Sequence, residues 1–448
     1  MNMNKLITFA AVAASAAIPM SANAAATEIS LVTNGVTWRV EIDSSNGTAT
    51  LGKDGCTPAS NAGSYRACDV ATVTTTDKIP WTFTYNDAAY TVTKVAPYAF
   101  FQAQGITGVL TIPDAVTTIG RNAFTLATGL TALKGFGGVT VLGDYAFGAC
   151  SNIESEYPDL SRLTSIGEAP FIQCPKMTGK LRLGESLSSL PQSAFQSTYF
   201  SGTAVIPASM TTMGKSSVFC INPNLSAIWV KGKPDAASQS YLTVYCAKLA
   251  AQCPSMKMIL MGKNTKGASM AQTGSNAMLY GDTGVQVFVP ANGYWDGLVA
   301  GGTNNKVWYY GPTGEFDLEI NHEWMQATIT PTTVNALTNV LAWVPAFKTH
   351  FNLDAHISVT NTIDLTDVTI TEDMVSGVTF DRLVLSAKTQ TQLNAILGAF
   401  PATTPISIDP TGLTENMVIP DGYPNVFVKT VPGVTIKRTV NGFKIIIK

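Results

Sequence analysis

The chain has 448 residues, of which 46% are hydrophobic and 13% are charged, and its formal net charge is −2 at pH 7. Such a length allows two or three domains or one elongated array of repeats. The small net charge and the absence of any run of Lys or Arg argue against nucleic acid as a partner.

The first 24 residues have the pattern of a secretory signal peptide. Met1–Lys5 carries one positive charge, Leu6–Ile18 is apolar, and Ala22-Asn23-Ala24 offers the small residues that signal peptidase requires. An apolar stretch of 13 residues is too short to cross a bilayer core of about 30 Å, so we expect cleavage after Ala24 rather than a membrane anchor. The mature chain is therefore expected to have no transmembrane segment and to be periplasmic, at the cell surface or secreted.

The cysteine content leaves the pairing open. An exported chain with seven cysteines has at least one that is unpaired. Cys56 and Cys68, twelve residues apart in a loop rich in Gly, Ser and Asn, are the best disulfide candidates, and the sequence does not establish that they pair.

Two segments near the N-terminus, Ile29–Leu51 and Trp81–Val95, alternate apolar and polar residues. This alternation predicts paired strands. We expect residues 25–95 to form a β cap for the repeats that follow, because a repeat array otherwise exposes an apolar end.

A seven-residue motif that ends in Phe recurs along the next part of the chain. It reads TIGRNAF at 118–124, VLGDYAF at 141–147, SIGEAPF at 165–171 and SLPQSAF at 189–195. The phenylalanines form a longer series with gaps of 24, 23, 24, 24 and 24 residues: Phe100, Phe124, Phe147, Phe171, Phe195 and Phe219. A fixed period in the twenties is typical of a solenoid whose units each give one strand and one return segment. We assign residues 96–311 to this solenoid, which is regular to about residue 230 and looser after it.

The repeated Phe is expected to form a buried column. One residue per unit lines up through the interior of a solenoid, because neighbouring strands lie about 4.8 Å apart. Six exposed rings would promote aggregation of a soluble protein, so a ligand-stacking face is the less favoured interpretation.

The residues before each Phe divide into turn and surface positions. The glycines are expected to supply a turn with positive φ: Gly120, Gly143, Gly167 and Gly214. The fourth and fifth residues of the four motif copies are expected to face outward and to carry any binding specificity: Arg121-Asn122, Asp144-Tyr145, Glu168-Ala169 and Gln192-Ser193.

Within one unit, Ile112-Pro113, Val116, Ile119-Gly120, Ala123-Phe124 and Leu130 follow the order I-P-x-x-V-x-x-I-G-x-x-A-F-x-x-C-x-x-L. This order resembles the BspA-like leucine-rich repeats, and the resemblance covers Val95 to Trp229 in six units. The chain departs from it at Pro170, at Pro191 and by one extra residue before Phe219. The resemblance implies a strand-dominated α/β leucine-rich repeat solenoid and a surface or secreted protein associated with adhesion to host or matrix proteins.

Cys150 and Cys174 fill the cysteine position of two successive units. They could form a disulfide or provide two ligands for a metal ion. Buried free cysteines behave as small hydrophobes, and we favour that role for a position inside the solenoid.

The array continues more loosely after residue 230. QCPKM at 173–177 returns as QCPSM at 252–256, followed by the strand-like segment Lys257–Leu260. Ser238–Ala251 is predicted to be helical, Val285–Pro290 to be an edge strand, and Tyr294–Val307 to be a loop at a domain boundary.

Beyond Gly314 the Phe signal is lost and a different internal similarity appears. TEDMV at 371–375 returns as TENMV at 414–418, and helices are predicted at Thr333–Phe347 and Thr389–Phe400. We assign residues 312–448 to a C-terminal strand–helix repeat region.

The three histidines give no catalytic motif. His322 begins HEWMQ, which lacks the second His of a metalloprotease helix. His350 and His356, with Asp354 between them, form only a weak metal-binding pattern, and loop positions at the surface are the favoured interpretation.

Three acidic residues, Glu315, Asp317 and Glu319, would share one face of a strand. A calcium site or an acid/base pair is conceivable there, but half-buried strands have the same pattern, and glycosidase chemistry needs two carboxylates across a cleft. The sequence has no phosphate loop, nucleophile elbow, dinucleotide fingerprint or paired C-x-x-C. We therefore expect no catalytic, cofactor-binding or metal-binding residues and no cofactor.

These features favour a secreted or surface-exposed recognition or adhesion protein, non-catalytic, that binds a protein or glycan through its leucine-rich repeat surface. One alternative is a cell-envelope hydrolase with its active site in the C-terminal region, and another is a purely structural envelope protein. Clustering of the ionisable side chains in a cleft would favour the hydrolase: Glu315, Asp317, Glu319, His350 and His356.

Overall fold

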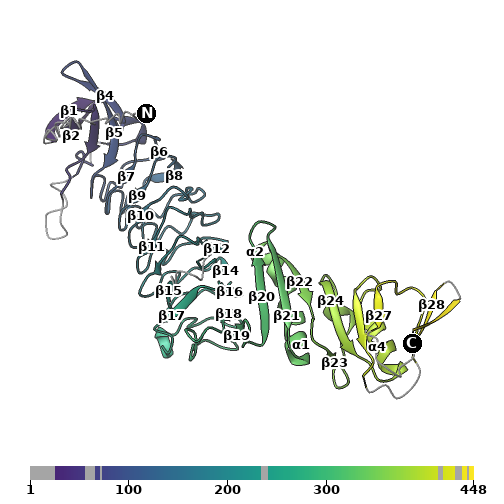
Figure 1. Ribbon diagram of the computed structural model, residues 1–448. Helices are drawn as coiled ribbons and strands as arrows, with labels where there is room; N and C mark the ends of the chain where they lie inside the picture. Colours follow the sequence, from purple (N-terminus) through teal and green to yellow (C-terminus); the bar gives the residue numbers. More distant parts are fainter. Residues whose placement is uncertain are drawn as a thin grey trace, which may run out of the picture.

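The computed structural model describes residues 26–55, 66–70, 73–233, 241–411, 417–428, 436–440 and 443–447. The predicted signal peptide, residues 1–24, lies outside these residues, as does Cys56, the predicted partner of Cys68. The molecule is elongated, with stacked turns of chain followed by a strand–helix region (Figure 1). Strands dominate and helices are few, which confirms the predicted strand-dominated class.

The N-terminal strands pair as the alternation predicted. Three form antiparallel hairpins, β1 (Thr27–Thr33), β2 (Val36–Asp43) and β3 (Thr48–Leu51). A second hairpin joins β4 (Thr82–Tyr85) to β5 (Ala88–Val95), and β5 also runs parallel to β3. A short 3₁₀ helix, η2, precedes it at Thr76–Lys78.

The stacked turns are joined by two sets of parallel strands. We call one set the short-strand ladder; after β5 it consists of β7 (Thr118–Ile119), β9 (Val141–Leu142), β10 (Ser165–Ile166), then β11 (Ser189–Leu190), β13 (Thr212–Met213), β15 (Leu242–Tyr245) and β17 (Thr265–Ala268). The other set is the long-strand ladder: β6 (Gly108–Ile112), β8 (Leu130–Gly135), then β12 (Gly202–Ile206), β14 (Leu225–Val230), β16 (Met258–Met261), β18 (Gln286–Pro290) and β19 (Lys306–Tyr310). A second 3₁₀ helix, η3, lies at Gly274–Asn276.

The predicted Phe column is confirmed. All six rings are at most 1% exposed. Phe124 stacks on Phe100 with ring centroids 4.9 Å apart and on Phe147 at 5.1 Å, and Phe147 stacks on Phe171 at 5.5 Å, each within 5° of parallel. This spacing follows from the separation of neighbouring strands, because each turn of chain places its ring over the ring before it.

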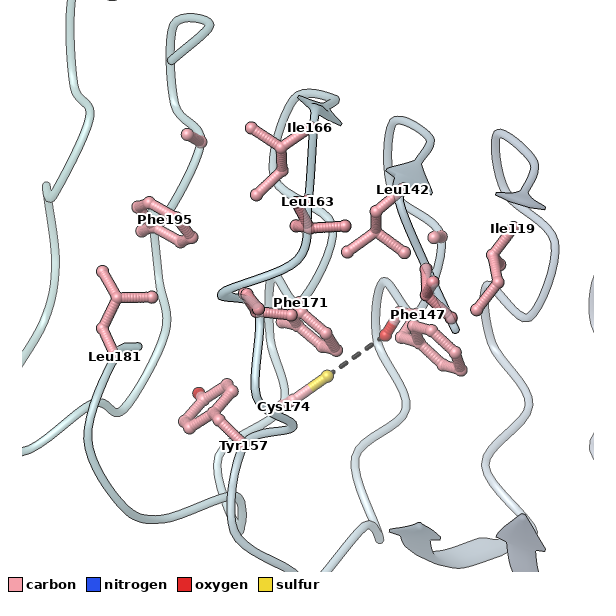
Figure 2. Close-up of a cluster of buried hydrophobic side chains, with 14 of the residues drawn as sticks. Ile119, Leu142, Phe147, Tyr157, Leu163, Ile166, Phe171, Cys174, Leu181 and Phe195 are labelled. Atoms are coloured by element: carbon pink, nitrogen blue, oxygen red, sulfur yellow. Dashed lines mark hydrogen bonds between the residues drawn. The ribbon is translucent and has the colours of Figure 1, made fainter. Parts of the chain in front are cut away.

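The favoured role of the repeat cysteines is also confirmed. Cys150 and Cys174 are buried free thiols, and each Sγ donates to the carbonyl oxygen of a column phenylalanine at 3.1 Å, Phe124 and Phe147 respectively. Figure 2 shows the Cys174 contact beside the stacked rings. Burial raises the pKa of Cys174 to about 12, so the thiol stays protonated at neutral pH.

The short-strand ladder and the Phe column are both interrupted between β10 and β11. In the other turns the glycine N–H donates across the ladder, as from Gly167 to the Leu142 oxygen at 2.7 Å and from Gly214 to the Leu190 oxygen at 2.9 Å. Pro191 occupies the corresponding position and has no N–H to donate. The departure from the repeat at this residue thus explains why two separate short-strand sheets form.

The prediction that the repeat glycines supply positive φ is wrong. Positive φ falls instead on the residue two positions later, as in Asn122 (52°) and Tyr145 (53°). The glycines are required for space: a Cβ added at Gly143 would lie 2.4 Å from the backbone N of Arg121, and one at Gly167 would lie 2.3 Å from that of Asp144. Each glycine therefore lets the backbone of the preceding turn approach closely.

Gly143→Ala is expected to destabilise the protein by about 1–3 kcal/mol, because backbone atoms would have to move. Urea unfolding followed by circular dichroism measures the change. Gly398→Ala is the matched control, since a Cβ there meets nothing within 4 Å and the residue lies in a helix. The control should raise stability by up to about 1 kcal/mol; equal effects of the two substitutions would contradict the close-approach explanation.

Two element predictions for the later repeats are wrong. Ser238–Ala251 is not a helix: residues 234–240 lie outside the described part, and Leu242–Tyr245 is strand β15, whose buried Leu242 and Val244 alternate with partly exposed residues and hold it between β13 and β17. Strand β18 is not an edge, because β16 pairs with one side of it and β19 with the other.

The long-strand ladder runs on into the C-terminal region instead of ending. Its further strands are β20 (Phe316–Asn321), β21 (Gln326–Pro331), β22 (Asp354–Ser358), β24 (Thr379–Ser386), β25 (Ile406–Asp409) and β27 (Val426–Val428), with β23 (Ile363–Asp364) beside β24. A small sheet contains β26 (Met417–Ile419), β28 (Ile436–Val440) and β29 (Phe443–Ile447).

Both predicted C-terminal helices are confirmed, one of them in two parts. Helix α1 (Val334–Trp343) is capped by the Thr333 side chain and is followed at once by α2 (Pro345–Phe351). Helix α4 (Gln390–Ala399) begins with a capping box between Thr389 and Gln392, and a short helix, α3, lies at Glu372–Val375.

Helices α1 and α2 cover one face of the long-strand ladder. Phe288 of β18 lies 4.6 Å from Trp343 and 5.5 Å from Phe347 between ring centroids, and Trp229 of β14 lies 6.1 Å from Phe351. Strands β14, β16 and β18 are consequently buried on both faces. The C-terminal region therefore shares a core with the last repeats, and the proposed boundary at residue 311 stays a prediction.

Candidate binding groove

A groove of about 880 Å³ lies where the repeats meet the β20–β21 hairpin. One wall comes from the loops that follow β14 and β16, including Lys231 and Lys263. The other wall is the hairpin face that carries two cross-strand pairs, Glu319 with Thr328 and Asn321 with Gln326. The continuous long-strand ladder thus brings together residues separated by about a hundred positions in the chain.

Trp324 stands at the tip of the hairpin with 70% of its surface exposed. The Asn321 Oδ1 atom accepts hydrogen bonds from the backbone N–H groups of Glu323 at 3.0 Å and Trp324 at 3.1 Å, which fixes the turn. The ring of His322 stacks on buried Trp229 at 5.5 Å and so anchors the tip to the repeats.

The charges along the groove are largely paired. Lys231 lies 3.7 Å from Glu185, and Lys263 lies 3.6 Å from Glu319. The Lys233 ammonium donates to the backbone oxygen of Ser209 at 2.8 Å. Burial, together with the nearby charge of Lys231, lowers the pKa of His322, so this imidazole is neutral at pH 7.

Two polar side chains of the groove are available to form hydrogen bonds with a ligand. Within the described parts of the chain, the side chains of Gln326 and Thr328 have no hydrogen-bond partner. The groove therefore presents an exposed indole, an amide and a hydroxyl to any molecule that enters it, beside ion pairs that already satisfy one another.

The five ionisable residues proposed for a hydrolase do not form one cluster. Glu319 lines the groove, whereas Glu315 lies at a separate hollow with Thr332 and Thr333. His350 is on α2, the helix that packs against β12 and β14. Among the residues described, no three His, Cys, Asp or Glu side chains are grouped so that they could hold a metal ion.

His356 instead takes part in a local network on β22. Its Nδ1 lies 2.7 Å from Asp381 Oδ1, and its Nε2 lies 3.4 Å from Asp354 Oδ2. Burial favours the neutral ring, but hydrogen bonds to Asp381 and Asp354 outweigh it and raise the pKa of His356. The sequence pattern identified Asp354 and missed Asp381. Asp381 belongs to the neighbouring strand β24, from which it contacts the ring of His356.

Asp381→Asn is expected to lower the pKa of His356, because the charge beside Nδ1 is removed. Titration of the histidine ring protons by NMR measures the fall in the pKa of His356. Asp317→Asn is the control, since the Asp317 carboxylate accepts from the backbone of Leu318. An unchanged His356 pKa in the Asp381 variant would contradict this account.

The outward-facing positions of the repeats are only partly as expected. Arg121 and Asp144 are partly exposed and form an ion pair at 3.8 Å, and Gln192 is exposed. Ala169 is only 1% exposed, so the prediction is wrong there, because a single methyl group does not reach beyond the backbone around it. Sequence reasoning missed the groove itself; the available signal was a tryptophan in the turn between two alternating strands.

Comparison with known proteins concerns the repeats. Residues 93–226 match the BspA type leucine rich repeat region in six copies. No curated protein matches the chain.

Three solved bacterial structures are similar at low identity. A leucine rich cell surface protein from Faecalibacterium prausnitzii A2-165 has 16% identity and a TM-score of 0.33, with 65% of this chain and 97% of that chain covered. The pneumococcal vaccine antigen PcpA has 16% identity and a TM-score of 0.37, with 91% and 99% covered. A leucine-rich repeat protein from Bacteroides ovatus ATCC 8483 has 15% identity and a TM-score of 0.26, with 93% and 98% covered. TM-scores this low support no inference about the present chain, so the family evidence is confined to the repeats: residues 93–226 form a BspA type leucine rich repeat region.

Proposed function

We propose that the chain is an exported, non-catalytic recognition or adhesion protein that binds a protein or glycan outside the cell. The observation that carries the proposal is the groove, where Trp324 is exposed near the polar side chains of Gln326 and Thr328, which are available to bond a ligand. Ligand sites are concave and combine apolar or aromatic side chains with a few polar groups, and the lining of this groove contains both. The signal-peptide pattern of residues 1–24 supports export, and among the described residues no helix is long and apolar enough to cross a membrane.

In this proposal the chain has three functional parts after the signal peptide. Residues 25–95 are a β cap, residues 96–311 are a solenoid, and residues 312–448 are a C-terminal region that completes the groove. Buried Trp38 packs edge-to-face on Phe100 with centroids 6.2 Å apart, as expected of a cap over the end of the Phe column. The solenoid supplies a rigid support for the binding surface.

A hydrolase is the less favoured alternative. Hydrolysis of a glycan needs two carboxylates held across the substrate. In the groove, Glu185 and Glu319 are each ion-paired with a lysine, and Glu315 faces another hollow. A purely structural envelope protein would need no groove and would bind no soluble partner.

Binding of residues 25–448 to immobilised extracellular-matrix proteins and cell-envelope polysaccharides tests the proposal. We expect retention on at least one of them, with loss of retention after Trp324→Ala. Phe427→Ala, which also truncates an exposed aromatic residue, is the control and should bind as the unsubstituted chain does. Failure to bind any of these materials would favour the structural alternative.

A further inference from the structure

We infer that the groove beside Trp324 binds a neutral glycan, with the indole as a stacking platform for a sugar ring. This inference rests on the proposed recognition function and adds the chemical class of the ligand. Three properties of the groove lead to it: the exposed aromatic face, the mutual neutralisation of its charges, and the mixed donors and acceptors on the hairpin wall.

The aromatic face suits a pyranose. A sugar ring presents C–H groups on one face and hydroxyls around its edge, so it can cover an indole while its hydroxyls remain hydrogen-bonded. Trp324 is 70% exposed, and its backbone is fixed by the two hydrogen bonds to Asn321. With the backbone held, only the two side-chain torsions of Trp324 have to be ordered when the ligand stacks on the indole.

The charges disfavour an anionic ligand. The groove contains the cations Lys231, Lys233 and Lys263. Two of them face carboxylates within 3.7 Å, and the third donates to a backbone oxygen. His322 is neutral. An acidic sugar or phosphate would have to displace these contacts, whereas a neutral ligand leaves them intact.

The hairpin wall offers the hydrogen-bonding groups that hydroxyls need. Gln326 provides two amide donors and a carbonyl acceptor, and Thr328 provides a hydroxyl that can donate or accept. Both lie on the same hairpin face, and neither has a partner among the described residues. Sugar hydroxyls also both donate and accept, so they can satisfy these groups simultaneously.

The size of the groove favours an oligosaccharide over a protein partner. Its volume of about 880 Å³ lies within the usual range of small-ligand sites, about 300–1,000 Å³. A stable protein interface needs about 800 Å² per partner around an apolar centre. Here a single exposed indole is bordered by ion pairs and amides, which provides no such centre.

The direct test is titration of residues 25–448 with neutral hexasaccharides: maltohexaose, cellohexaose, xylohexaose, mannohexaose and N-acetylchitohexaose. Tryptophan fluorescence and acrylamide quenching are suitable probes, because Trp324 is by far the most exposed of the seven tryptophans, all of which lie in the described residues. Trp81 is partly buried, and the other five are buried. We expect at least one sugar to bind and to protect Trp324 from the quencher. Calorimetry on the same samples gives the affinity.

Variants distinguish the loss of stacking on Trp324 from effects that any surface substitution would have on binding. Trp324→Ala should weaken binding by about tenfold or more, and Trp324→Tyr should retain part of it, because a smaller aromatic face remains. Gln326→Ala should weaken binding without changing the exposure of Trp324, and Phe427→Ala should bind as the unsubstituted chain does. Because no ion pair is broken, the affinity should change little with salt.

Two results would overturn the inference: no binding to any sugar in the panel, or binding that Trp324→Ala leaves unchanged. Preference for hyaluronan hexasaccharide over every neutral sugar would also overturn it. Retention of the chain on a matrix protein, lost in Trp324→Ala, would then leave the recognition function standing and remove only the glycan assignment.

Discussion

Replacing Phe147 by alanine is expected to lower the free energy of unfolding by about 3–5 kcal/mol. The ring is fully buried between the rings of Phe124 and Phe171, and Phe136 approaches it from the side at 5.7 Å between centroids. Truncation removes contacts on all of these sides at once. Collapse of the turns into the space is opposed by the hydrogen bonds between them, such as that from the Phe147 N–H to the Pro170 oxygen at 2.8 Å.

Urea unfolding monitored by circular dichroism measures this change, and the midpoint should fall without a large change in slope. Phe427→Ala is the matched control, because the same truncation at a residue 57% exposed should cost no more than about 0.5 kcal/mol. Unfolding of the Phe147 variant at the same urea concentration as the unsubstituted chain would contradict the packing of the column.

The sequence predicted the column because each turn repeats the same environment. When Phe recurs every 23 or 24 residues, a position inside the solenoid for one ring implies the same position for all six. The rings are buried because they are large and apolar. The role of the repeat glycines does not follow from the repeat alone. A glycine can mean positive φ or close approach, and only the neighbouring turn, with Pro97 N 2.5 Å from a Cβ at Gly120, distinguishes the two.

The groove could not be predicted, because it depends on how distant segments meet. Lys231 and Trp324 lie 93 positions apart in the sequence and share a site only because β20 continues the ladder of the repeats. The pairing of β19 with β20 at Tyr310 and Phe316 makes that connection, and no local pattern at this point indicates it. The HEWMQ segment lacks the second His of a metal-binding motif, and its exposed residue at the groove is the tryptophan.

A buried acid near the end of the repeats is a second feature with a large expected effect. Asp282 is 2% exposed; its Oδ1 accepts from the Cys253 N–H at 2.6 Å, and its Oδ2 has no partner in the described structure. Burial raises the pKa of Asp282 to about 7, although the hydrogen bond from Cys253 acts in the opposite direction. Asn222 occupies the corresponding position two turns earlier, where its amide donates to Phe195 and Phe219.

The raised pKa makes stability depend on pH in a defined direction. Between pH 4 and pH 7 the carboxyl is ionised in the unfolded chain and protonated in the folded one, so the folded state binds the additional proton. The contribution of Asp282 to stability therefore falls as pH rises through this range. Above about pH 7 the carboxylate is charged in both states, and its desolvation cost is fully present.

Asp282→Asn should remove this dependence. An amide stays neutral at every pH and can still accept from the Cys253 N–H, so the variant should exceed the unsubstituted chain in stability by up to about 4 kcal/mol at pH 8. The difference should shrink to about 0.5 kcal/mol near pH 4, where the folded-state acid is protonated and the unfolded-state acid is about half protonated. Unfolding free energies of the two proteins from pH 4 to 8 measure it, and subtraction cancels the titration of all other groups. A constant difference across that range would mean that the Asp282 carboxyl is already ionised in the folded protein at pH 4.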